Sequence, residues 1–376
     1  MINKRAHFSE ITVVSIISLI CCLFVLNRNQ KISKKEVIPR KLWAFYNIRW
    51  GNPEVDKQWI GWEQSGVGWE KGKITPPGTW PSIFMPELGL YSVFNSTVVN
   101  RHMDLIKKAG IDAIIINWFG KDRIEYGYNG TQGFTNKALA FIIKKAAKRS
   151  IKVGVMIPNY DGRTTGGVID DVKFYLTKYG KMRNILKIFS RPMVFIYDAH
   201  ALADNFNVTV ANYGTIKPIF FASGTKYEDF VVSYENGYAG FLSFFAPDGF
   251  TASSQVDNWH ALSRFANSRD LFFIPTVTPG YNDNIMYPWN SRFVSNRNSG
   301  QYYETRWKHA AIHNPKIIFL NSFNNWIEST NIEPAINHDS KPLNNETWSD
   351  NQDPLFYIQL TRRYSDLFKA NKLFTL

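Results

Sequence analysis

The side chains best suited to chemistry in this sequence are amides, aromatic rings and a few carboxylates that directly follow short β-rich runs. The richest of these places is the segment 321–334 (NSFNNWIESTNIEP), which contains Asn325 and Glu328. The candidate sugar-contacting residues are Tyr46, Trp118, Tyr160, Asp198, Phe244, Tyr281, Asn324 and Trp326. Amides hydrogen-bond hydroxyl groups, aromatic rings cover the apolar faces of sugars, and carboxylates transfer protons. The combination therefore predicts a site for a carbohydrate.

Eight β-rich runs, most of them separated by helical stretches, must position these side chains. The runs are 44–48, 112–118, 152–158, 193–198, 217–222, 239–244, 271–277 and 316–321. Several are almost continuously apolar, as expected of parallel strands covered on both faces. Alternation of strand and helix repeated eight times predicts an α/β fold, a (β/α)₈ TIM barrel over residues 42–376, with its active site at the C-terminal ends of the strands. A doubly wound sheet is the alternative, but no glycine-rich phosphate loop follows the first run.

Apolar residues at helical spacing predict the helices between these runs. They are expected at 97–109, 136–149, 168–187, 255–268, 301–313 and 355–372, and Asn136 is the expected cap of the second. A long connection, 49–96, follows the first run and holds five of the twelve tryptophans. Long loops inside compact domains are usually functional. We expect most of these tryptophans to pack the loop onto the barrel and one or two to stack on sugar.

Other kinds of chemistry find little support in the residues. Both cysteines, Cys21 and Cys22, lie in an apolar N-terminal segment, so the rest of the chain offers no thiol nucleophile or thiolate ligand. His309 and His313 have metal-like spacing, but their helix leads away from the active end of a barrel, which indicates a structural or surface role. No G-x-S-x-G elbow is present. We therefore expect no metal and no cofactor.

The charge distribution argues against nucleic acid as a partner. The formal net charge is +13, and the lysines and arginines are spread along the whole chain. A scattered excess of this kind, without a nucleic-acid-binding motif, is typical of a solvated basic surface.

The N-terminal segment predicts attachment to a membrane. Residues 11–26 (ITVVSIISLICCLFVL) are uncharged and mostly apolar, which is sufficient for a transmembrane anchor in a thin bilayer. A cleaved signal peptide is the alternative, but no small-x-small cleavage site follows Leu26. Residues 1–10 would then form a cytoplasmic tail, and the polar, basic residues 27–41 a stem. Four sequons, at Asn95, Asn129, Asn207 and Asn345, favour a lumenal barrel.

The segment 321–334 resembles the signature that follows the last strand in glycoside hydrolase family 99, the endo-α-1,2-mannosidases, which read S-F-N-E-W-x-E-G-T-x-I-E there. The likeness extends over essentially the whole chain after the stem. Further matching stretches are Pro279-Gly280-Tyr281 with Asp283, Pro288-Trp289-Asn290 and Leu360-Thr361-Arg362-Arg363. The resemblance implies a (β/α)₈ enzyme that cuts inside mannose-rich N-glycans with retention and without a metal. It also implies a single-pass type II protein of the Golgi membrane.

The resemblance assigns roles to two residues of this segment. Glu328 falls at the position of the general acid, which later acts as general base. Asn325 falls where the family has a glutamate that takes the proton of the sugar 2-hydroxyl, and a neutral amide cannot accept that proton. The other departures from the family pattern are Asn47, Met156, Phe244 and Tyr287, which stand where the family has tyrosine, histidine, tyrosine and arginine.

Two interpretations stay open at this point. The first is an endo-mannosidase with an altered mechanism or specificity, in which Asp198, Asp283 or Glu333 replaces the missing base. The second is a catalytically silent relative that binds mannose-rich glycans as a lectin-like module. Family membership makes the hydrolase the better single statement.

Overall fold

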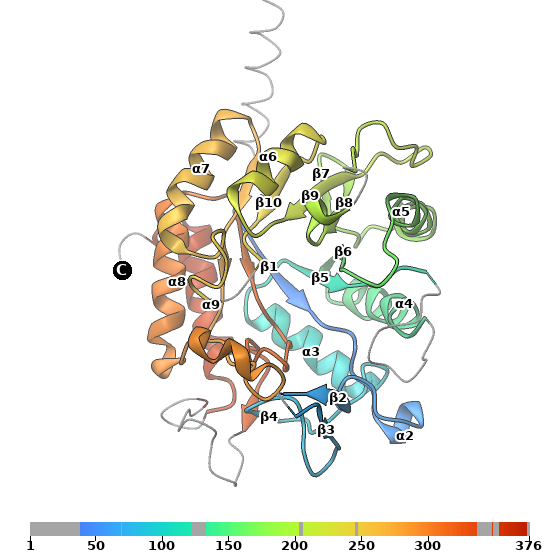
Figure 1. Cartoon of the computed structure of the whole chain (residues 1–376), viewed down its shortest axis with the longest axis vertical. Coiled ribbons are helices and arrows are strands. Elements are labelled where there is room, and N and C mark those ends of the chain that lie inside the picture. The colour runs from blue at the N-terminus through green and yellow to red at the C-terminus, as the bar shows by residue number, and fades with distance from the viewer. Residues whose placement is uncertain are drawn as a thin grey trace, which may run out of the picture.

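A barrel of parallel strands forms the centre of the molecule (Figure 1). The computed structural model describes residues 38–68, 70–121, 133–202, 206–244, 247–336, 348 and 353–373. The barrel strands are β1 (Lys41–Tyr46), β5 (Ala113–Asn117), β6 (Lys152–Ile157), β8 (Arg191–Ile196), β9 (Ile219–Ser223), β10 (Gly240–Leu242), β11 (Phe272–Ile274), β12 (Thr276–Val277) and β13 (Ile317–Leu320). Each of the eight predicted runs overlaps at least one of them.

The seventh predicted run, residues 271–277, closes the barrel although it is divided into two short strands. Neighbouring strands pair in the order β11, β10, β9, β8, β6, β5, β1, β13, β12, so the two ends of the order are β11 and β12. These two are consecutive in the chain and flank Pro275, which has no N–H to donate. The carbonyl group of Pro275 still accepts a hydrogen bond from the Phe319 N–H at 3.0 Å. The strand order therefore returns to its start, as the TIM-barrel prediction requires.

Helices surround the barrel on its outer side (Figure 1). They are α3 (Ser96–Lys108), α4 (Phe134–Ala147), α5 (Thr165–Tyr179), α6 (Tyr227–Glu235), α7 (Trp259–Ser268), α8 (Gln301–Ile312) and α9 (Phe356–Lys369). The predicted helices are confirmed with shifted ends, and α6 was not predicted.

Two local predictions about these helices are wrong. Asn136 does not cap α4, because the helix begins earlier and Gly133, with a left-handed backbone, precedes it. The predicted helix 168–187 ends at Tyr179, because the chain then turns into β7 (Lys187–Ile188), which pairs antiparallel with the start of β8. Apolar spacing alone did not distinguish this hairpin from a continued helix.

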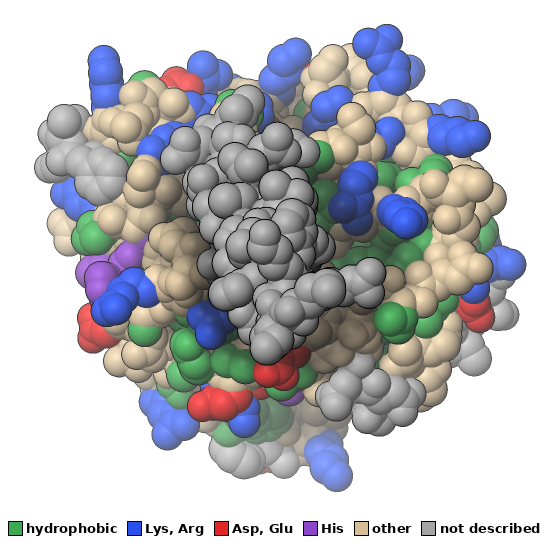
Figure 2. Space-filling model, turned by 90° about the horizontal axis from the view of Figure 1, so that it is seen from above, with side chains coloured by type: hydrophobic (Ala, Val, Ile, Leu, Met, Phe, Trp, Pro, Cys, Tyr) green, Lys and Arg blue, Asp and Glu red, His purple; other side chains and the backbone are tan. Residues whose placement is uncertain are grey.

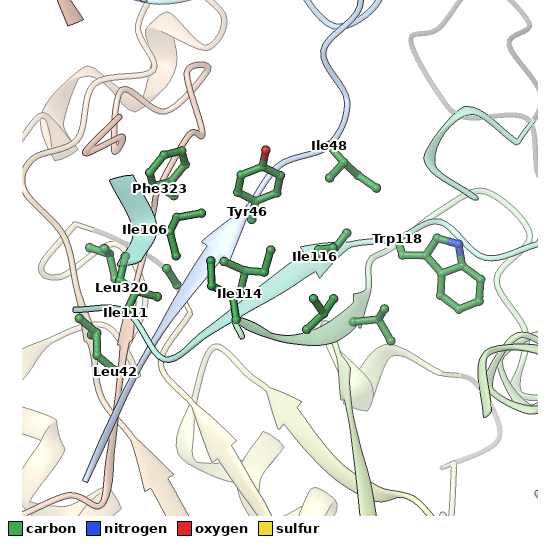
Figure 3. Close-up of a cluster of buried hydrophobic side chains, with 14 of the residues drawn as sticks. Leu42, Tyr46, Ile48, Ile106, Ile111, Ile114, Ile116, Trp118, Leu320 and Phe323 are labelled. Atoms are coloured by element: carbon green, nitrogen blue, oxygen red, sulfur yellow. The ribbon is translucent and has the colours of Figure 1, made fainter. Parts of the chain in front are cut away.

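Successive side chains of each barrel strand alternate between the lumen of the barrel and the surrounding helices. On β1, Trp43 and Phe45 belong to the lumen cluster, whereas Leu42 and Tyr46 belong to the cluster that includes helix residues. Figure 3 shows part of this outer layer, in which Leu42 and Tyr46 lie near Ile106 of α3. The alternation decides which strand-end side chains can face a substrate.

The long connection after β1 folds against the end of the barrel that carries the segment 321–334. It contains α2 (Pro53–Asp56), β2 (Gln64–Val67), β3 (Gly72–Ile74) and β4 (Met85–Pro86), and β4 pairs with β14 (Ala335–Ile336). Trp50 and Trp62 are fully buried and stack with ring centroids 4.1 Å apart. The prediction that tryptophans of this connection pack it onto the barrel is confirmed for these two, whereas Trp69 lies outside the described residues.

The membrane prediction falls outside the part of the chain that the structure describes. Residues 11–26 are not described, and neither are the sequon residues Asn129 and Asn345. Among the described residues, no helix has the length and apolar character needed to cross a membrane. Of the two described sequon residues, Asn95 caps α3, and the side chain of Asn207 accepts hydrogen bonds from Thr209.

Candidate active site

The segment 321–334 lies at the C-terminal ends of the barrel strands, which form the end of the barrel called the mouth below. The Phe323 N–H donates to the carbonyl of Phe45 at 2.9 Å, which joins the segment to β1. The Asn282 N–H donates to the carbonyl of Glu328 at 2.9 Å, which joins it to the chain that follows β12. The predicted position of Glu328 at the mouth is therefore the one observed.

The pKa of the Glu328 carboxyl group lies close to neutral pH. Burial and the negative charge of Asp283 raise the pKa of Glu328 to about 7. Hydrogen bonds from the side chains of Asn325 and Asn321 and the positive charge of Arg49 act in the opposite direction, because they stabilise the carboxylate. The side chain still keeps part of its surface open to solvent. A carboxyl group with these properties can give and take a proton near neutral pH, as a general acid/base must.

Asn325 lies directly beside this carboxyl group. Its side chain hydrogen-bonds Glu328, and its backbone N–H donates to Ser322 Oγ at 2.7 Å. Only 6% of Asn325 is exposed. The position that the family resemblance assigns to a base thus holds a neutral amide that touches the candidate acid.

Glu333 is the centre of a buried hydrogen-bond network behind the mouth. Its carboxylate accepts from Tyr91 Oη at 2.6 Å and from Trp326 Nε1 at 3.2 Å, and it lies 2.9 Å from His102 Nε2. The other ring nitrogen of His102 lies 2.9 Å from Tyr46 Oη. These contacts join the segment 321–334 to β1, to α3 and to the long connection. Glu333 therefore has a structural role and cannot replace the missing base without breaking this network.

A buried arginine holds the same segment from another side. Arg297 is 1% exposed and donates through Nη2 to the carbonyls of Ser329 at 2.8 Å and Asn331 at 2.9 Å. Its guanidinium carbon lies 4.5–4.7 Å from three aromatic ring centres, those of Phe84, Trp348 and Tyr357. Rings of this kind stabilise a cation that has lost its water. Arg297 consequently fixes the backbone just after Glu328.

Of the three carboxylates proposed as replacement bases, Asp283 is the one that interacts with Glu328. One oxygen of Asp283 accepts from Tyr281 Oη at 2.6 Å and from Asn290 Nδ2 at 2.8 Å. The other oxygen, Oδ1, is buried without a hydrogen-bond partner in the described structure. Burial raises the pKa of Asp283 above its ordinary value. By contrast, Asp198 bonds Asn159 Nδ2 at 3.1 Å and is not among the groups that shift the pKa of Glu328.

Four of the candidate sugar-contacting residues support the site from behind. Tyr46 and Trp118 point outward from the barrel, and Trp118 lies against Phe174 and Tyr175 of α5. Asn324 pairs with the backbone of Asn47, accepting from its N–H at 2.7 Å and donating to its carbonyl at 2.9 Å. Trp326 bonds Glu333, as described above. All four are fully buried, so this structure corrects the expectation that they contact sugar: Tyr46, Trp118, Asn324 and Trp326.

The other four candidates lie nearer the open part of the mouth. Phe244 belongs to the lumen cluster, with its ring 5.3 Å from that of Tyr197. Tyr281 bonds Asp283, while Tyr160 and Asp198 are partly exposed. Sequence reasoning gave no site role to Asn321 or Arg49, although both interact with Glu328. Tyr197, at the end of a predicted run, interacts with Glu328 as well. The alternation along β8 and β13 is the signal that identifies Tyr197 and Asn321 as lumen-facing.

The described residues offer no obvious metal site. No group of three or more His, Cys, Asp or Glu side chains among them is arranged to hold a metal ion. His313 lies at the end of α8, with its ring 6.4 Å from that of His260 and 6.3 Å from that of Trp259. This placement agrees with the structural role predicted for His313.

The chain is similar in sequence and in fold to known proteins. The model of glycosyl hydrolase family 99 matches residues 38–370. The chain belongs to this family. The glycoprotein endo-alpha-1,2-mannosidase of Xenopus laevis is 30% identical over 356 residues, which cover 88% of this chain and 78% of that protein. The glycoprotein endo-alpha-1,2-mannosidase-like protein of Homo sapiens is 30% identical over 360 residues, covering 88% and 76%.

A solved structure of a family 99 member is similar over the whole barrel. The GH99 endo-alpha-mannosidase from Bacteroides thetaiotaomicron has a TM-score of 0.77 and 25% identity, over 88% of this chain and 98% of that one. The TIM-barrel prediction is confirmed, and this family 99 protein is a glycosidase.

The Glu333 network predicts a large effect on stability. Replacing Glu333 with alanine is expected to lower the free energy of unfolding by about 3–5 kcal/mol, because buried polar partners would lose their charged acceptor. Urea unfolding followed by circular dichroism measures this loss. Glu235→Ala, at an exposed site at the end of α6, serves as the control and should change the value by less than ~0.5 kcal/mol. Equal effects of the two substitutions would contradict the structural role of Glu333.

The charge of Asp283 predicts a second measurable effect. Asp283→Asn is expected to lower the pKa of Glu328 from about 7, because the substitution removes a negative charge that disfavours the carboxylate. The protonated fraction at neutral pH then falls, and any step that needs protonated Glu328 weakens on the alkaline side. Carbon NMR titration of the Glu328 carboxyl group measures the pKa without requiring turnover. Asp198→Asn is the control, and a pKa that responds equally to both changes would argue against a specific effect of Asp283.

Proposed function

We propose that this family 99 glycosidase hydrolyses α-mannosidic bonds inside mannose-rich N-glycans with retention of configuration, and that Glu328 is its general acid/base. The observation that carries the proposal is the position of Glu328 at the mouth, with a pKa raised to about 7. The endo-alpha-1,2-mannosidases to which the chain is similar support the substrate class. Carboxyl groups tuned in this way protonate the leaving oxygen of a glycoside and then activate water.

The proton of the sugar 2-hydroxyl needs an acceptor in this mechanism, and Asn325 cannot be that acceptor. Its amide has no useful basicity, although it can hold the hydroxyl and orient Glu328. Loss of a general base costs on the order of 10²–10⁴ in rate. Asp283 is the replacement we choose among the described carboxylates, because its charge acts on Glu328 and its Oδ1 has no hydrogen-bond partner. Asp283 is only 2% exposed, so this role requires its side chain to turn toward the bound sugar.

The proposed reaction balances with these two carboxyl groups. In the first step Asp283 takes the 2-hydroxyl proton, the freed oxygen bonds to the anomeric carbon, and Glu328 protonates the departing sugar oxygen. In the second step Glu328 takes a proton from water, which attacks the anomeric carbon. The bond to the 2-oxygen then breaks, and that oxygen recovers its proton from Asp283. Two displacements at one carbon retain its configuration.

Asn325 also favours a second candidate function, binding of mannose-rich glycans without cleavage. An amide beside a protonated carboxyl group is suited to hold sugar hydroxyls, which a lectin-like module requires. Both functions use the same mouth, so turnover is what distinguishes them.

We also propose that residues 11–26 anchor the chain in the Golgi membrane as a single-pass type II protein, with the barrel in the lumen. The apolar sequence of that segment and the four sequons support this topology. At Asn95 and Asn207 the described hydrogen bonds use the side-chain oxygen, whereas a glycan attaches to the nitrogen. Removal of N-glycans by an endoglycosidase should therefore increase the electrophoretic mobility of the cellular protein.

Substitutions at the two neighbouring positions test the proposed activity. With a glucosylated mannose-rich glycan as substrate, Glu328→Gln is expected to abolish the cleavage that the wild type performs. Asn325→Glu is expected to raise kcat, on the order of 10²–10⁴-fold, because it supplies a base next to the acid. Chromatography of the released sugars measures both effects, and Asn267→Glu, on the exposed side of α7, controls for the added charge. Binding of the glycan without cleavage by the wild type would instead establish the lectin-like function.

A further inference from the structure

Two exposed aromatic side chains lie together on the loop that follows β12. Trp289 is 47% exposed and Tyr287 is 39% exposed. Of the tryptophans that the structure describes, Trp289 is the only exposed one, since the others are buried or half-buried. The centroids of the two rings are 5.5 Å apart, and the ring planes are tilted by 54°. Burial of an aromatic side chain removes about 150–250 Å² from water, and this pair forgoes much of that gain. The pair is called the aromatic platform below.

Backbone hydrogen bonds fix the conformation of the loop that carries the platform. The Tyr287 N–H donates to the carbonyl of Asp283 at 2.8 Å, and the Asn290 N–H donates to the carbonyl of Tyr287 at 2.9 Å. Trp289 lies in the 3₁₀ helix that follows, Pro288–Phe293. Because the backbone is already ordered, a ligand that binds to the two rings would lose little affinity to ordering of the loop.

The long connection after β1 also supports this loop. The Gly68 N–H, directly after β2, donates to the carbonyl of Met286 at 3.1 Å. A Cβ atom at Gly68 would lie 3.8 Å from the ring of Pro288, which is van der Waals contact. The platform therefore lies where the long connection meets the loop after β12, on the end of the barrel that carries the mouth.

The platform is close to the candidate acid. Asn282, whose N–H binds the carbonyl of Glu328, precedes Tyr287 by five residues. Burial raises the pKa of the Tyr287 hydroxyl, Arg49 lowers it, and the negative charges of Glu328 and Asp283 raise it further. Charges have such an effect only at short range, so Tyr287 lies near the groups of the candidate active site. The platform is thus an extension of that site and not a separate surface.

A comparably exposed ring at the opposite end of the barrel has different surroundings. Phe189 is 50% exposed and lies at the tip of the hairpin of β7 and β8, before β8 enters the barrel. Figure 2 views this end of the molecule, and Lys and Arg side chains are spread over it. Phe189 therefore matches Trp289 in exposure but not in place, which makes it a suitable control.

We propose that Tyr287 and Trp289 form a subsite for an outer sugar of a mannose-rich glycan, a sugar that takes no part in the bond to be cleaved. The inference rests on the proposed function, because it takes the mouth to be a glycan site. Aromatic rings cover the apolar face of a hexose, while at an exposed rim the hydroxyl groups of the sugar stay in water. The two side chains carry no charge, which suits a neutral sugar. Tyr287 stands where the family pattern has arginine, so the second ring is a departure of this chain from that pattern.

Calorimetric titration of the full-length protein with two glycans tests the subsite. A large mannose-rich glycan reaches beyond the cleaved bond, whereas α-1,2-mannobiose supplies only the two sugars that this bond joins. The titrations use Glu328→Gln as the background, so that no cleavage occurs. In this background Trp289→Ala and Tyr287→Ala are each expected to weaken binding of the large glycan roughly tenfold, the upper range for one aromatic contact. Binding of mannobiose should change less than about twofold.

Ring-retaining substitutions and the distant aromatic residue are the controls. Tyr287→Phe and Trp289→Tyr keep a ring and should retain the affinity for the large glycan within about threefold. Phe189→Ala should leave the affinity for both glycans unchanged. Equal losses for the large glycan and mannobiose, or equal losses with alanine and with a retained ring, would overturn the subsite.

The same titrations separate failure of the subsite from failure of the proposed function. Unchanged affinity of Trp289→Ala and Tyr287→Ala for the large glycan overturns the subsite alone, and the proposed function stands. Binding of neither glycan, by the wild type or in the Glu328→Gln background, overturns both.

Discussion

The position of Glu328 depends on a carboxylate that takes no part in the proposed chemistry. Glu333 bonds Tyr91 and Trp326 and lies against His102, and each of these residues comes from a different part of the chain. A buried carboxylate is costly unless charged or polar partners surround it, so the network has few alternative arrangements. The segment 321–334 is consequently held in one conformation relative to β1, α3 and the long connection. Arg297 completes the support by holding the backbone at Ser329 and Asn331.

With its backbone fixed in this way, the chemistry of Glu328 follows from its surroundings. Two opposing influences set its pKa: burial and Asp283 raise it, whereas Asn325, Asn321 and Arg49 lower it. A flexible loop would average over these contacts and leave the carboxyl group close to its ordinary value. The rigid support therefore keeps the pKa of Glu328 raised. Because the barrel holds the groups around Glu328 in place beforehand, they need not reorganise during the reaction.

The sequence predicted the barrel well because each strand is a compact apolar run and the runs recur eight times. It also located Glu328, since the segment after the last strand of a barrel must lie at the mouth. It did not separate the side chains that face the lumen from those that face the helices, and so Tyr46 and Trp118 were assigned to sugar contact. The two-residue alternation along β1 and β5 contains that information, because Trp43, Phe45 and Ala113 face the lumen while Tyr46 faces α3.

Other features depend on contacts that no local pattern contains. His102 and Glu333 are 231 residues apart, and nothing in the spacing of either residue indicates the other. The end of α5 at Tyr179 depends on the pairing of β7 with β8, which competes with helix formation over residues 184–188. Tertiary pairing decides such boundaries, and propensity then has little influence.

The same arrangement explains how the base position can change without loss of the fold. Asn325 is held through its backbone N–H by Ser322, and its side chain contacts Glu328 rather than the Glu333 network. Exchange of glutamate for an amide at this position therefore alters proton transfer but removes none of the bonds that fix the segment. A carboxylate there would also add a negative charge beside Glu328, which would raise the pKa of Glu328 further. The amide relieves that repulsion, and it leaves Asp283 as the only carboxylate among those that shift the pKa of Glu328.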